Sequence, residues 1–526
     1  MALVQANRDK RFKGPVTWAE ERLKILHRVI FDDNVRAAQF QAFHAGSVKK
    51  QQAFDRTVQF WARSAHIYAS YKATQLRVQF VKDEAERDRI WEAQHERAAD
   101  RLHALCCDLK GFFLKTAQLL AKPDLAPMAW VKKLVVLCDQ APETPYERVR
   151  GVLEEELGKS FDDLFDRFDV KPLGSASVAQ VHKARLKGGT RDVAVKVQHP
   201  GAHELMMTDI RNQKLFARVL QKTDLKFDLV SVMEELEAQV EYEFDFVREA
   251  TSMDRIAIAL DTANKGKSPV IIPRSVPGLV TRRVMCMDFI EGTPIMQMEG
   301  ELAKRGINPN GRVAKMAKKS ILKDLSSAYG QMILRDGFFQ ADPHPGNILI
   351  NSKGKVALLD YGQTKELTQE VKLGFAKVVV GLANNNREEI VEALNELGFG
   401  TTSISNDLED TKILAQLLFD TKLPHGWKMA SPFGENSILK AISVEKLPQE
   451  LFFVIRTAQL LRGLSVGMDL PFSTSQQWKP LAEAALAAAR KSSTFDVTGK
   501  TIENRTRELH WRRRKRLGRG NLQAVV

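Results

Sequence analysis

The chain of 526 residues has few cysteines, and their arrangement suggests neither a metal site nor a disulfide framework. The four are Cys106, Cys107, Cys138 and Cys286; two are adjacent, and no C-x-x-C pair occurs. Structural zinc sites and disulfide-rich domains both need more cysteines at close spacing. We therefore expect reduced, buried thiols in an intracellular protein.

Long apolar runs are also absent. No run reaches the roughly 18 uninterrupted apolar residues that a membrane span needs. The leader MALVQANRDKRFKG is basic and has no apolar region, which argues against a secretory signal. Asp9, Glu20 and Glu21 weaken an organelle presequence without excluding it.

Acidic residues are too few to balance the basic ones, and the net charge is +14. Such an excess favours anionic partners: phosphates, nucleic acid or an acidic membrane surface. Much of it lies in the C-terminal run RTRELHWRRRKRLGRG, and no nucleic-acid recognition fold accompanies this run. Two interpretations stay open: a solvated tail, or an anchor on an anionic surface with Trp511 at the interface.

The composition changes along the chain and predicts five segments. Helix-forming residues dominate the first part, prolines interrupt the helices that follow, and a β-rich texture begins near Val170. The predicted segments are an N-terminal helical region (1–108), a helical extension (109–169), a β-containing lobe (170–293), a helical lobe (294–490) and a basic tail (491–526).

Local signals predict several element boundaries. The run Glu147–Leu157 predicts a helix that Gly158 ends, and Phe161–Phe168 predicts a second short helix. Two strand-like runs joined at Lys187-Gly188-Gly189 predict a hairpin. Further expected elements are helices at 202–262, at 310–335 and onward to about 490, and strands at Val270–Ile272 and Leu279–Phe289.

The stretch from Gln340 to Lys365, QADPHPGNILINSKGKVALLDYGQTK, has oxygen ligands at both ends of a predicted hairpin. Asp342 and Asn347 stand five positions apart, and Asp360 follows thirteen later. Protein kinases have the same D-x-x-x-x-N spacing in the catalytic loop, followed by the magnesium-binding D-F-G, here Asp-Tyr-Gly. The pattern predicts phosphoryl transfer from ATP.

A phosphoryl-transfer site also needs a lysine and a loop that cradles phosphates. The strand Val193–Lys196 offers the lysine in the context of the V-A-I-K strand of kinases, although an ordinary surface lysine would look the same. The loop Gly174–Ala179, GSASVA, has one glycine followed by small residues. Such a loop lets backbone amides approach phosphates but has less freedom to take positive φ.

The orienting carboxylate is expected in EYEFDFVREA, which contains Glu243, Asp245 and Glu249. Asp245 and Glu249 are one helical turn apart and should share a face. One of the three acids is expected to pair with Lys196 while the others contribute to a metal site, although an acidic helix face of this kind is commonly just solvated. Two kinase features are missing: no H-R-D precedes the loop, and no A-P-E follows it.

Taken together, these motifs resemble the UbiB family, also called aarF-domain-containing or ADCK-like atypical kinases. GFFLKTAQLLAKPDLAP is similar to the family's K-x-G-Q helix and R-P-D-L-L-P segment, and GSASVAQVHKARL to its alanine-rich loop. VAVKVQHPG resembles the lysine strand, EFDFVREA the E-x-D segment, and FFQADPHPGNILI with LLDYG the catalytic and metal-binding loops.

The resemblance implies an α+β fold: a bilobal protein-kinase-like fold with a small β-containing N-lobe, a mostly helical C-lobe and an N-terminal helical extension. It implies ATP and Mg²⁺ as cofactors, a role in isoprenoid-quinone or lipid metabolism, peripheral membrane contact, and a mitochondrion or chloroplast as the compartment. Protein partners stay unknown. The implied site residues are Asp342 (catalytic aspartate), Lys196 (phosphate lysine) and Glu249 (its ion-pair partner); Asn347 and Asp360 (metal); Gly174, Ser175, Ala176, Ser177, Val178 and Ala194 with Lys196 (nucleotide); and Lys115, Gln118, Glu243 and Asp245 (regulatory extension).

The chain departs from the family pattern mainly at Ala117, which gives KTAQ in place of K-x-G-Q. If the glycine allows close helix packing, the added methyl group should loosen it. Two other functions stay open: a small-molecule phosphotransferase like aminoglycoside or choline kinases, whose D-x-H-P-x-N loop is similar, and a nucleotide-binding pseudokinase scaffold. His199 and His203 have a spacing that suits a metal, but an ordinary loop-to-helix start explains them better.

Overall fold

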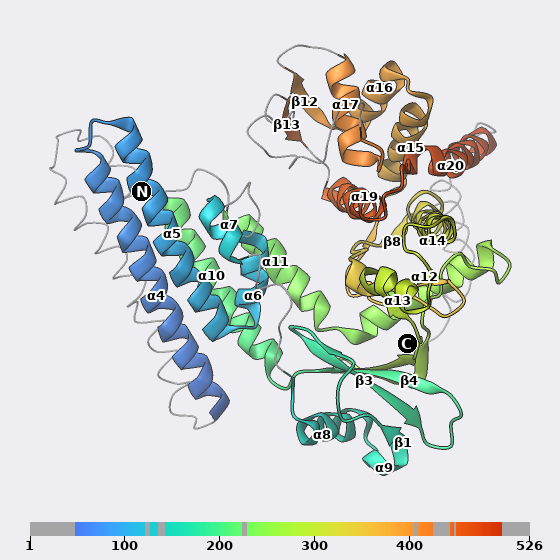
Figure 1. Cartoon of the computed structure of the whole chain (residues 1–526), viewed down its shortest axis with the longest axis horizontal. Coiled ribbons are helices and arrows are strands. Elements are labelled where there is room, and N and C mark those ends of the chain that lie inside the picture. The colour runs from blue at the N-terminus through green and yellow to red at the C-terminus, as the bar shows by residue number, and fades with distance from the viewer. Residues whose placement is uncertain are drawn as a thin grey trace, which may run out of the picture. The chain divides into compact units, whose positions relative to one another are not determined.

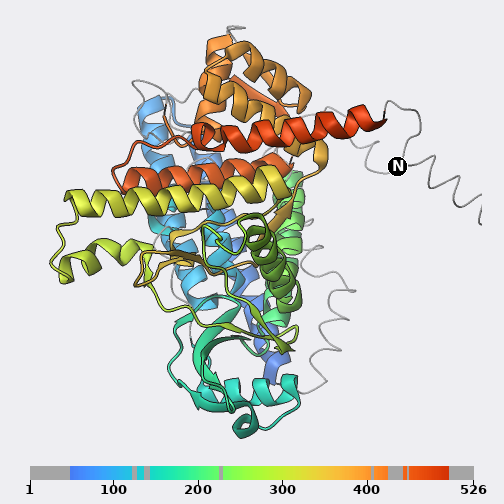
Figure 2. The ribbon, with the colours of Figure 1, turned by 90° about the vertical axis from the view of Figure 1, so that its right-hand side faces the viewer.

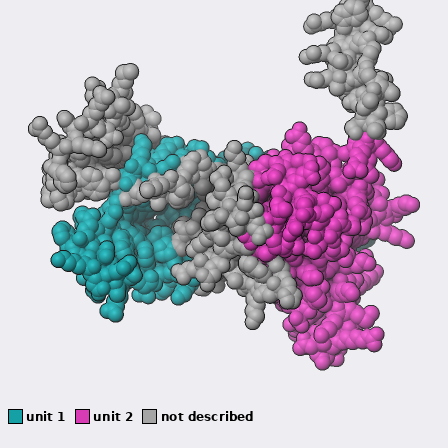
Figure 3. Space-filling view, turned by 90° about the horizontal axis from the view of Figure 1, so that it is seen from above, with its two compact units in different colours: residues 1–247, 277–286 teal, residues 248–276, 287–526 magenta. Residues whose placement is uncertain are grey.

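The computed structural model describes residues 48–120, 127–134, 143–223, 229–403, 408–423, 442–446 and 449–496. They form two compact units: residues up to Val247 together with Pro277–Cys286 make unit 1, and Arg248–Val276 together with the residues from Met287 onward make unit 2 (Figure 3). The leader, Cys138 and the basic tail from residue 501 lie outside the described residues. The five predicted segments stay predictions.

Long helices pack together in unit 1 (Figure 1). α5 begins after Asp83, whose side chain accepts the N–H of Ala85. The buried faces meet in a core that includes Phe60, Leu105 and Phe113, so the expected amphipathic helices are confirmed here. The helices of this part are α4 (Val48–Val78), α5 (Glu84–Leu109), α6 (Phe112–Leu120), α7 (Met128–Leu134), α10 (Ala202–Thr223) and α11 (Leu229–Glu243).

An antiparallel sheet, together with helices α8 and α9, makes up the rest of unit 1. Its strand order is β1-β3-β4-β6-β5, with β2 paired to β3, and residues 277–286 of β5 and β6 belong to this unit. β3 and β4 form the predicted hairpin, in which Gly188 takes a φ of +68°. The elements are α8 (Tyr146–Leu157), α9 (Phe161–Leu164), β1 (Phe165–Phe168), β2 (Gly174–Ser175), β3 (Ala179–Leu186), β4 (Asp192–Gln198), β5 (Ser275–Val280) and β6 (Val284–Asp288).

The short helix predicted at Phe161–Phe168 is wrong in its second half. The helix ends at Leu164, and Phe165–Phe168 forms β1, which pairs with β3. Aromatic residues favour strands, and here Phe165 and Phe168 pack on each other with ring centroids 5.3 Å apart. Pairing with β3 therefore outweighs the local helical signal. The helix before it ends at Gly158, as predicted.

Unit 2 is mostly helical, with small sheets between the helices. Ile271, within the predicted strand Val270–Ile272, makes only an isolated bridge to Ala357. The elements are α12 (Phe246–Ala263, which starts in unit 1), β7 (Thr293–Pro294), η2 (Ile295–Gln297), α13 (Met298–Lys304), α14 (Arg312–Gly330), the π-helix η3 (Gln331–Asp336), β8 (Phe338–Gln340), η4 (Pro345–Asn347), β9 (Ile348–Ile350), β10 (Val356–Leu358), β11 (Thr364–Glu366), α15 (Gln369–Asn384), α16 (Arg387–Glu396), β12 (Gly400–Ser403), α17 (Leu408–Phe419), β13 (Ile442–Lys446), α19 (Gln449–Gly467) and α20 (Thr474–Asp496).

The core of unit 2 centres on Trp478 of α20, whose side chain is fully buried. Its indole N–H donates to the Ser326 carbonyl over 2.8 Å. A methyl group at Gly330 would lie 2.6 Å from Trp478 Cδ1, so α14 can approach α20 this closely only with glycine there. Figure 2 shows α14, α19 and α20 running side by side, and α14 contacts both partners.

The prediction that only helices follow the hairpin stretch Gln340–Lys365 is wrong at β12 and β13, which pair antiparallel between the helices. The threonines of β12, and the isoleucine and valine of β13, suit a strand, but the two runs are too far apart in the chain to show a hairpin pattern. Within the described residues, none of the helices has the length and hydropathy to cross a membrane.

Candidate active site

The predicted oxygen ligands lie in two loops that one small sheet of unit 2 holds together. β8 leads into the loop with Asp342, and β11 leaves the loop with Asp360. The two strands pair antiparallel, and the N–H of Ala341 donates to the carbonyl of Gln363 over 2.8 Å. Between the loops, β9 and β10 form the predicted hairpin. Asp342 and Asp360 therefore stand at the same end of the β8–β11 pair.

A buried glutamine fixes the backbones of both loops. Gln340 is only 1% exposed, and its Nε2 donates to the carbonyl oxygens of Asp342 over 2.8 Å and Asp360 over 3.0 Å. The hydroxyl of Tyr329 donates to Gln340 Oε1. Burial raises the pKa of Tyr329 well above its ordinary value, so this hydroxyl stays a donor. Gln340 thus sets the spacing between the two acidic loops.

Asn347 and Asp360 are brought together by the backbone. The Asn347 carbonyl accepts the N–H of Leu359 over 3.0 Å, directly before Asp360. Asp360 Oδ1 accepts the N–H of Gly362 over 2.9 Å, which orients the carboxylate. Magnesium prefers oxygen ligands and is usually bound through one or two carboxylates plus substrate phosphates.

The donor set fits magnesium that arrives with a nucleotide. Among the described residues, no group of three His, Cys, Asp or Glu side chains could hold a metal ion by itself. An amide and a carboxylate, at Asn347 and Asp360, leave the remaining coordination positions to phosphate oxygens and water. The site residues therefore suit a Mg-nucleotide better than a resident metal.

Glu249 lies beside Asp360. It stands in the first turn of α12 and is only 4% exposed. A methyl group at Gly362 would lie 3.3 Å from Asp360 Oδ1 and 3.9 Å from Glu249 Oε2, so both carboxylates face the same small space. One turn along α12, Ser252 accepts the hydroxyl of Thr364 over 3.2 Å. A side chain at Gly362 would therefore crowd the Asp360 carboxylate and fill the space that the two acids face.

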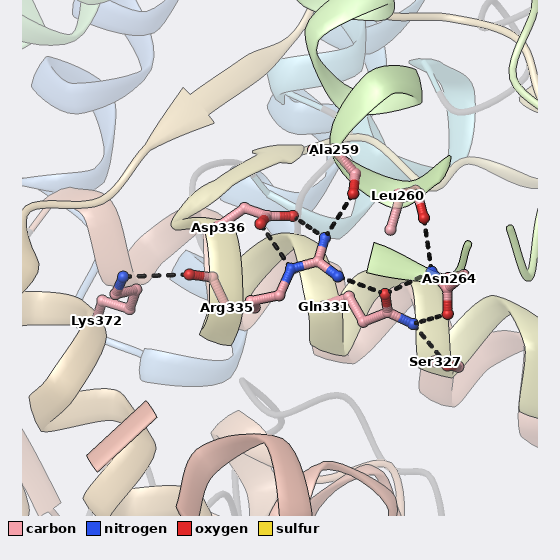
Figure 4. A network of polar contacts seen from close by, with 8 residues as sticks. All are labelled: Ala259, Leu260, Asn264, Ser327, Gln331, Arg335, Asp336 and Lys372. Atoms are coloured by element: carbon pink, nitrogen blue, oxygen red, sulfur yellow. Dashed lines mark hydrogen bonds and ion pairs between the residues drawn. The ribbon is translucent and has the colours of Figure 1, made fainter. Parts of the chain in front are cut away.

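A polar network ties α12 to the turn that leads into β8 (Figure 4). Arg335 donates to the Ala259 carbonyl over 3.2 Å and to Gln331 Oε1 over 2.8 Å, and Asn264 also donates to Gln331. On the other side, Lys372 of α15 donates to the Arg335 carbonyl over 3.2 Å. The helix of Glu249 and the strand before Asp342 are therefore held in one framework.

Asp342 itself pairs with an arginine far away in the chain. Arg456 of α19 donates from Nη2 to Asp342 Oδ1 over 2.9 Å, and from Nη1 to Gln363 Oε1 over 3.0 Å. The two side chains are 37% and 23% exposed, so water reaches the pair. One guanidinium thus contacts the Asp342 loop and the residue that follows D-Y-G.

Lys196 belongs to unit 1, where it lies on β4 with its ammonium 5.0 Å from the ring centroid of Phe246. Two positions on, Gln198 donates from Nε2 to the carbonyls of Phe244 over 2.9 Å and Arg282 over 2.8 Å. These bonds anchor the end of the lysine strand to the E-x-D segment. Ala194, on the same strand, is buried.

The predicted phosphate loop is a tight turn between β2 and β3. The N–H of Ala176 donates to the carbonyl of Ala179 over 2.8 Å, which leaves Ser177 and Val178 at the tip. Gly174 lies on β2 without a positive φ, and a methyl group there would meet nothing within 4 Å. The loop therefore does not depend on the backbone freedom of glycine, as its composition indicated.

His199, at the end of the lysine strand, links this loop to the chain before α8. Its Nδ1 lies 2.6 Å from the hydroxyl of Thr144, and its Nε2 lies 2.9 Å from the carbonyl of Ala176. A carbonyl only accepts, so Nε2 carries the proton and the Thr144 hydroxyl donates to Nδ1. His203 instead contacts Glu241 at 3.2 Å, so each histidine has its own protein partner.

The helical extension contacts the E-x-D segment within unit 1. Lys115 of α6 forms a salt bridge with Glu243 of α11. Ala117 is fully buried in the core around Phe60 and Leu134, where its methyl group is part of the packing. Gln118 lies on α6, and its side chain is outside the described set.

The helix face predicted for Asp245 and Glu249 is wrong. α11 ends at Glu243 and α12 begins at Phe246, so Asp245 lies in a break. In a continuous helix the Phe244 carbonyl would accept an N–H four residues on; here it accepts the side chain of Gln198. The aromatic rings on both sides of Asp245 are buried, which turns the chain at this point.

The structure thus gathers Glu249, Asp342, Asn347 and Asp360 in unit 2, and it places Lys196 in unit 1. The predicted pair of Lys196 with Glu249 would join residues of both units and stays a prediction. Gln340, Arg456 and His199 were not predicted as site residues. Gln340 had one signal, since it stands two residues before the aspartate in place of the histidine of H-R-D; Arg456 had none.

The paired acidic loops, the lysine strand in an antiparallel sheet and the helical second unit define a bilobal, protein-kinase-like fold. The ABC1 atypical kinase-like domain matches residues 136–394. AarF domain-containing protein kinase 1 of Gallus gallus is 33% identical over 401 residues, which are 72% of this chain and 73% of that protein. The Mus musculus protein of the same name is 34% identical over 396 residues, 72% of each chain.

The chain belongs to the ABC1/AarF family of atypical kinase-like proteins. A more distant relative is the protein ACTIVITY OF BC1 COMPLEX KINASE 8, chloroplastic, of Arabidopsis thaliana, 28% identical over 70% of this chain and 52% of that one. The fold also matches the structure of Rv3197 from Mycobacterium tuberculosis, solved in complex with erythromycin. The TM-score is 0.50 at 22% identity, over 75% of this chain and 97% of that one.

Proposed function

We propose that the protein binds Mg-ATP and works as an atypical kinase or ATPase. The observation that supports this most strongly is the grouping of Asp342, Asn347 and Asp360 at one end of paired strands, with Glu249 buried beside Asp360. Of these acids only Glu249 is buried, and a buried carboxylate costs free energy unless it is paired or hydrogen-bonded. Phosphoryl transfer needs oxygen ligands of this kind to hold its metal ion.

Each residue has a distinct role in the proposal. Asn347 and Asp360 would hold Mg²⁺, which would neutralise charge on the transferred phosphate. Lys196 binds nucleotide phosphates, and Glu249 orients it by an ion pair. Asp342 orients the attacking hydroxyl or water and accepts its proton. The turn at Gly174–Ala179 would approach the phosphates with backbone N–H groups other than that of Ala176, which donates to the carbonyl of Ala179.

The proposed acceptor is water, a lipid or a small phenol, and not a protein. Two features support this: no A-P-E follows Asp360, so the usual peptide platform is missing, and the extension helix α6 is tied to the E-x-D segment through Lys115. We propose a role in isoprenoid-quinone or lipid metabolism at a membrane surface, in a mitochondrion or chloroplast. The Arabidopsis relative, whose name reads chloroplastic, supports the compartment.

The activity is tested by ATP hydrolysis at saturating Mg-ATP in wild type and Asp342→Asn. Asparagine keeps an oxygen that can accept from Arg456 but cannot take a proton, so the loop should stay in place. We expect hydrolysis by the wild type and a loss of about 100-fold in the variant. Nucleotide binding without any hydrolysis would favour a pseudokinase scaffold. Phosphate transfer to aminoglycosides or choline would instead indicate a small-molecule phosphotransferase.

Membrane contact is tested with the full chain and a chain that ends at Thr501. Cosedimentation with vesicles of neutral lipid, and of neutral lipid with anionic lipid, should show binding of the full chain to anionic vesicles only. The basic run after Thr501 adds charge that anionic lipid attracts. Unchanged sedimentation of the shortened chain would contradict a tail anchor.

A further inference from the structure

Arg456 connects the two loops of the candidate site through its side chain. Its guanidinium donates to Asp342 Oδ1 over 2.9 Å and to Gln363 Oε1 over 3.0 Å. The backbones of the same two loops are already linked by the bond from Ala341 N–H to the Gln363 carbonyl and by the side chain of Gln340. The other two links end on backbone groups, whereas Arg456 contacts the Asp342 carboxylate itself.

The helix that provides Arg456 is itself attached to the same strand pair. Phe453, one turn earlier on α19, is buried, and Lys365 of β11 places its ammonium 4.1 Å from the centre of that ring. A cation over an aromatic face is attracted to it. Thr457 is fully buried and donates to the Phe453 carbonyl over 2.9 Å. α19 therefore presents Arg456 from a rigid, packed element.

An arginine is suited to this position in a way that lysine is not. Its planar guanidinium offers donors in fixed directions, so one group can reach two acceptors at once. A lysine ammonium also has several donors, but it is a point charge on a flexible chain and would not fix the directions of Asp342 and Gln363 as a planar guanidinium does. Since the pair is partly exposed to water, it adds little to folding stability. Its effect should appear in the orientation of Asp342.

We propose that Arg456 is a positioning residue that holds the Asp342 carboxylate toward the acceptor and couples the Asp342 loop to the D-Y-G loop. The proposal rests on the proposed function only in taking Asp342 as the residue that orients the acceptor. It assigns no contact between Arg456 and the nucleotide. Removing Arg456 should therefore lower kcat and leave nucleotide binding almost unchanged.

The test compares Arg456→Gln and Arg456→Lys with Arg255→Gln as a matched control. Arg255 pairs with Glu366 at the other end of β11 and lies 3.9 Å from the ring centroid of Phe338, so it touches the same sheet without touching either loop. All variants are made in the full chain. The measurements are kcat and KM for Mg-ATP, the melting temperature, and amide hydrogen exchange of residues 341–347 and 360–363 without nucleotide.

For Arg456→Gln we expect kcat to fall by about 10- to 100-fold, because a misplaced catalytic group can cost about that much. KM should stay within about twofold, and exchange in both loops should rise. Arg456→Lys should retain an intermediate kcat, and Arg255→Gln should match the wild type in all readings. Wild-type kcat and wild-type exchange in Arg456→Gln would overturn the proposal, as would a higher kcat.

The exchange measurement separates the two possible failures. If the wild type neither binds nor hydrolyses Mg-ATP, the proposed function fails, but faster loop exchange in Arg456→Gln would still show that Arg456 positions the loops. If the wild type is active and Arg456→Gln is slower without any change in loop exchange, the coupling of the loops is wrong. An equal loss of kcat in Arg255→Gln would show that any change at the β8–β11 sheet lowers kcat. That result would also overturn the proposal.

Discussion

Lys115 and Glu243 form a salt bridge between α6 and α11, although they stand 128 positions apart in the sequence. Both carboxylate oxygens accept from the same ammonium. The two side chains are 20% and 17% exposed, so water screens the pair only in part. The bridge ties the helical extension to the segment that contains Asp245 and leads into the helix of Glu249.

Loss of this salt bridge should loosen unit 1. In Lys115→Met the carboxylate of Glu243 keeps its partial burial but loses its counter-charge, and we expect a loss of about 1–2 kcal/mol. The double variant Lys115→Met with Glu243→Leu should recover part of that loss, because no unpaired charge remains. Denaturant unfolding of the two single variants and the double variant gives the coupling energy. Additive effects would show that the pair does not interact.

Gln340 should matter for the stability of unit 2. In Gln340→Leu two loop carbonyls and the buried Tyr329 hydroxyl lose their partner, which should cost about 2–4 kcal/mol. Tyr329→Phe removes one of these bonds and should cost about 1–2 kcal/mol. Thermal or denaturant unfolding measures both. A Gln340→Leu variant as stable as the wild type would contradict the role assigned to this side chain.

His199 should make unit 1 sensitive to acid. Burial lowers the pKa of His199, and also that of His182 on β3, below the ordinary value of 6.5. The unfolded chain therefore binds more protons than the folded chain below pH 6.5, so stability is full above that pH and falls as the pH drops. We expect a lower melting temperature at pH 5.5 than at pH 7.5.

Two variants isolate the contribution of His199. His199→Gln removes one titrating group and should reduce the difference in melting temperature between the two pH values. Thr144→Val removes the hydroxyl that donates to Nδ1 but keeps the imidazole, so it should lower the melting temperature at pH 7.5 and retain an acid-dependent loss. An unchanged pH dependence in His199→Gln would contradict the assignment.

The same substitution should have opposite effects at two glycines, one inside the contact of α14 with α20 and one on an open face of α19. In Gly330→Ala the new methyl group would lie 2.6 Å from Trp478 Cδ1, and overpacking should cost about 2–3 kcal/mol. Gly463 lies on α19 with nothing within 4 Å of the added carbon, so Gly463→Ala should stabilise the protein by about 0.5–1 kcal/mol. The free energy of unfolding of each variant is compared with that of the wild type. Changes of the same sign in the two variants would contradict the packing described.

The local parts of the candidate site were predictable from sequence, because they depend on neighbouring residues. The spacing of Asp342 and Asn347, the hairpin between β9 and β10, and the glycine of D-Y-G follow from a short run of the chain. The partners of these residues were not predictable. Arg456 stands 114 positions after Asp342, and no pattern near Arg456 indicates which acid it meets.

Competing tertiary contacts explain the wrong predictions. Phe165 and Phe168 lie in a run with helical character, but pairing with β3 makes it a strand. Gln198 takes the carbonyl of Phe244, and this ends the helix that the acidic run predicted through Asp245. In both places a residue distant in sequence decides the local structure. A prediction made from a window of ten to fifteen residues therefore cannot include the contact that decides between helix and strand or ends the helix.

The most direct test of the central claim is Mg-ATP binding by wild type and Asp360→Asn, measured as the shift in melting temperature with and without Mg²⁺. Asparagine keeps the oxygen that accepts the Gly362 N–H but removes the charge that would hold the metal. Asp162→Asn, at a side chain that is 84% exposed, is the matched control. The account predicts a Mg-dependent rise in wild type and control that Asp360→Asn loses. If none of the three proteins responds to Mg-ATP, the account is contradicted.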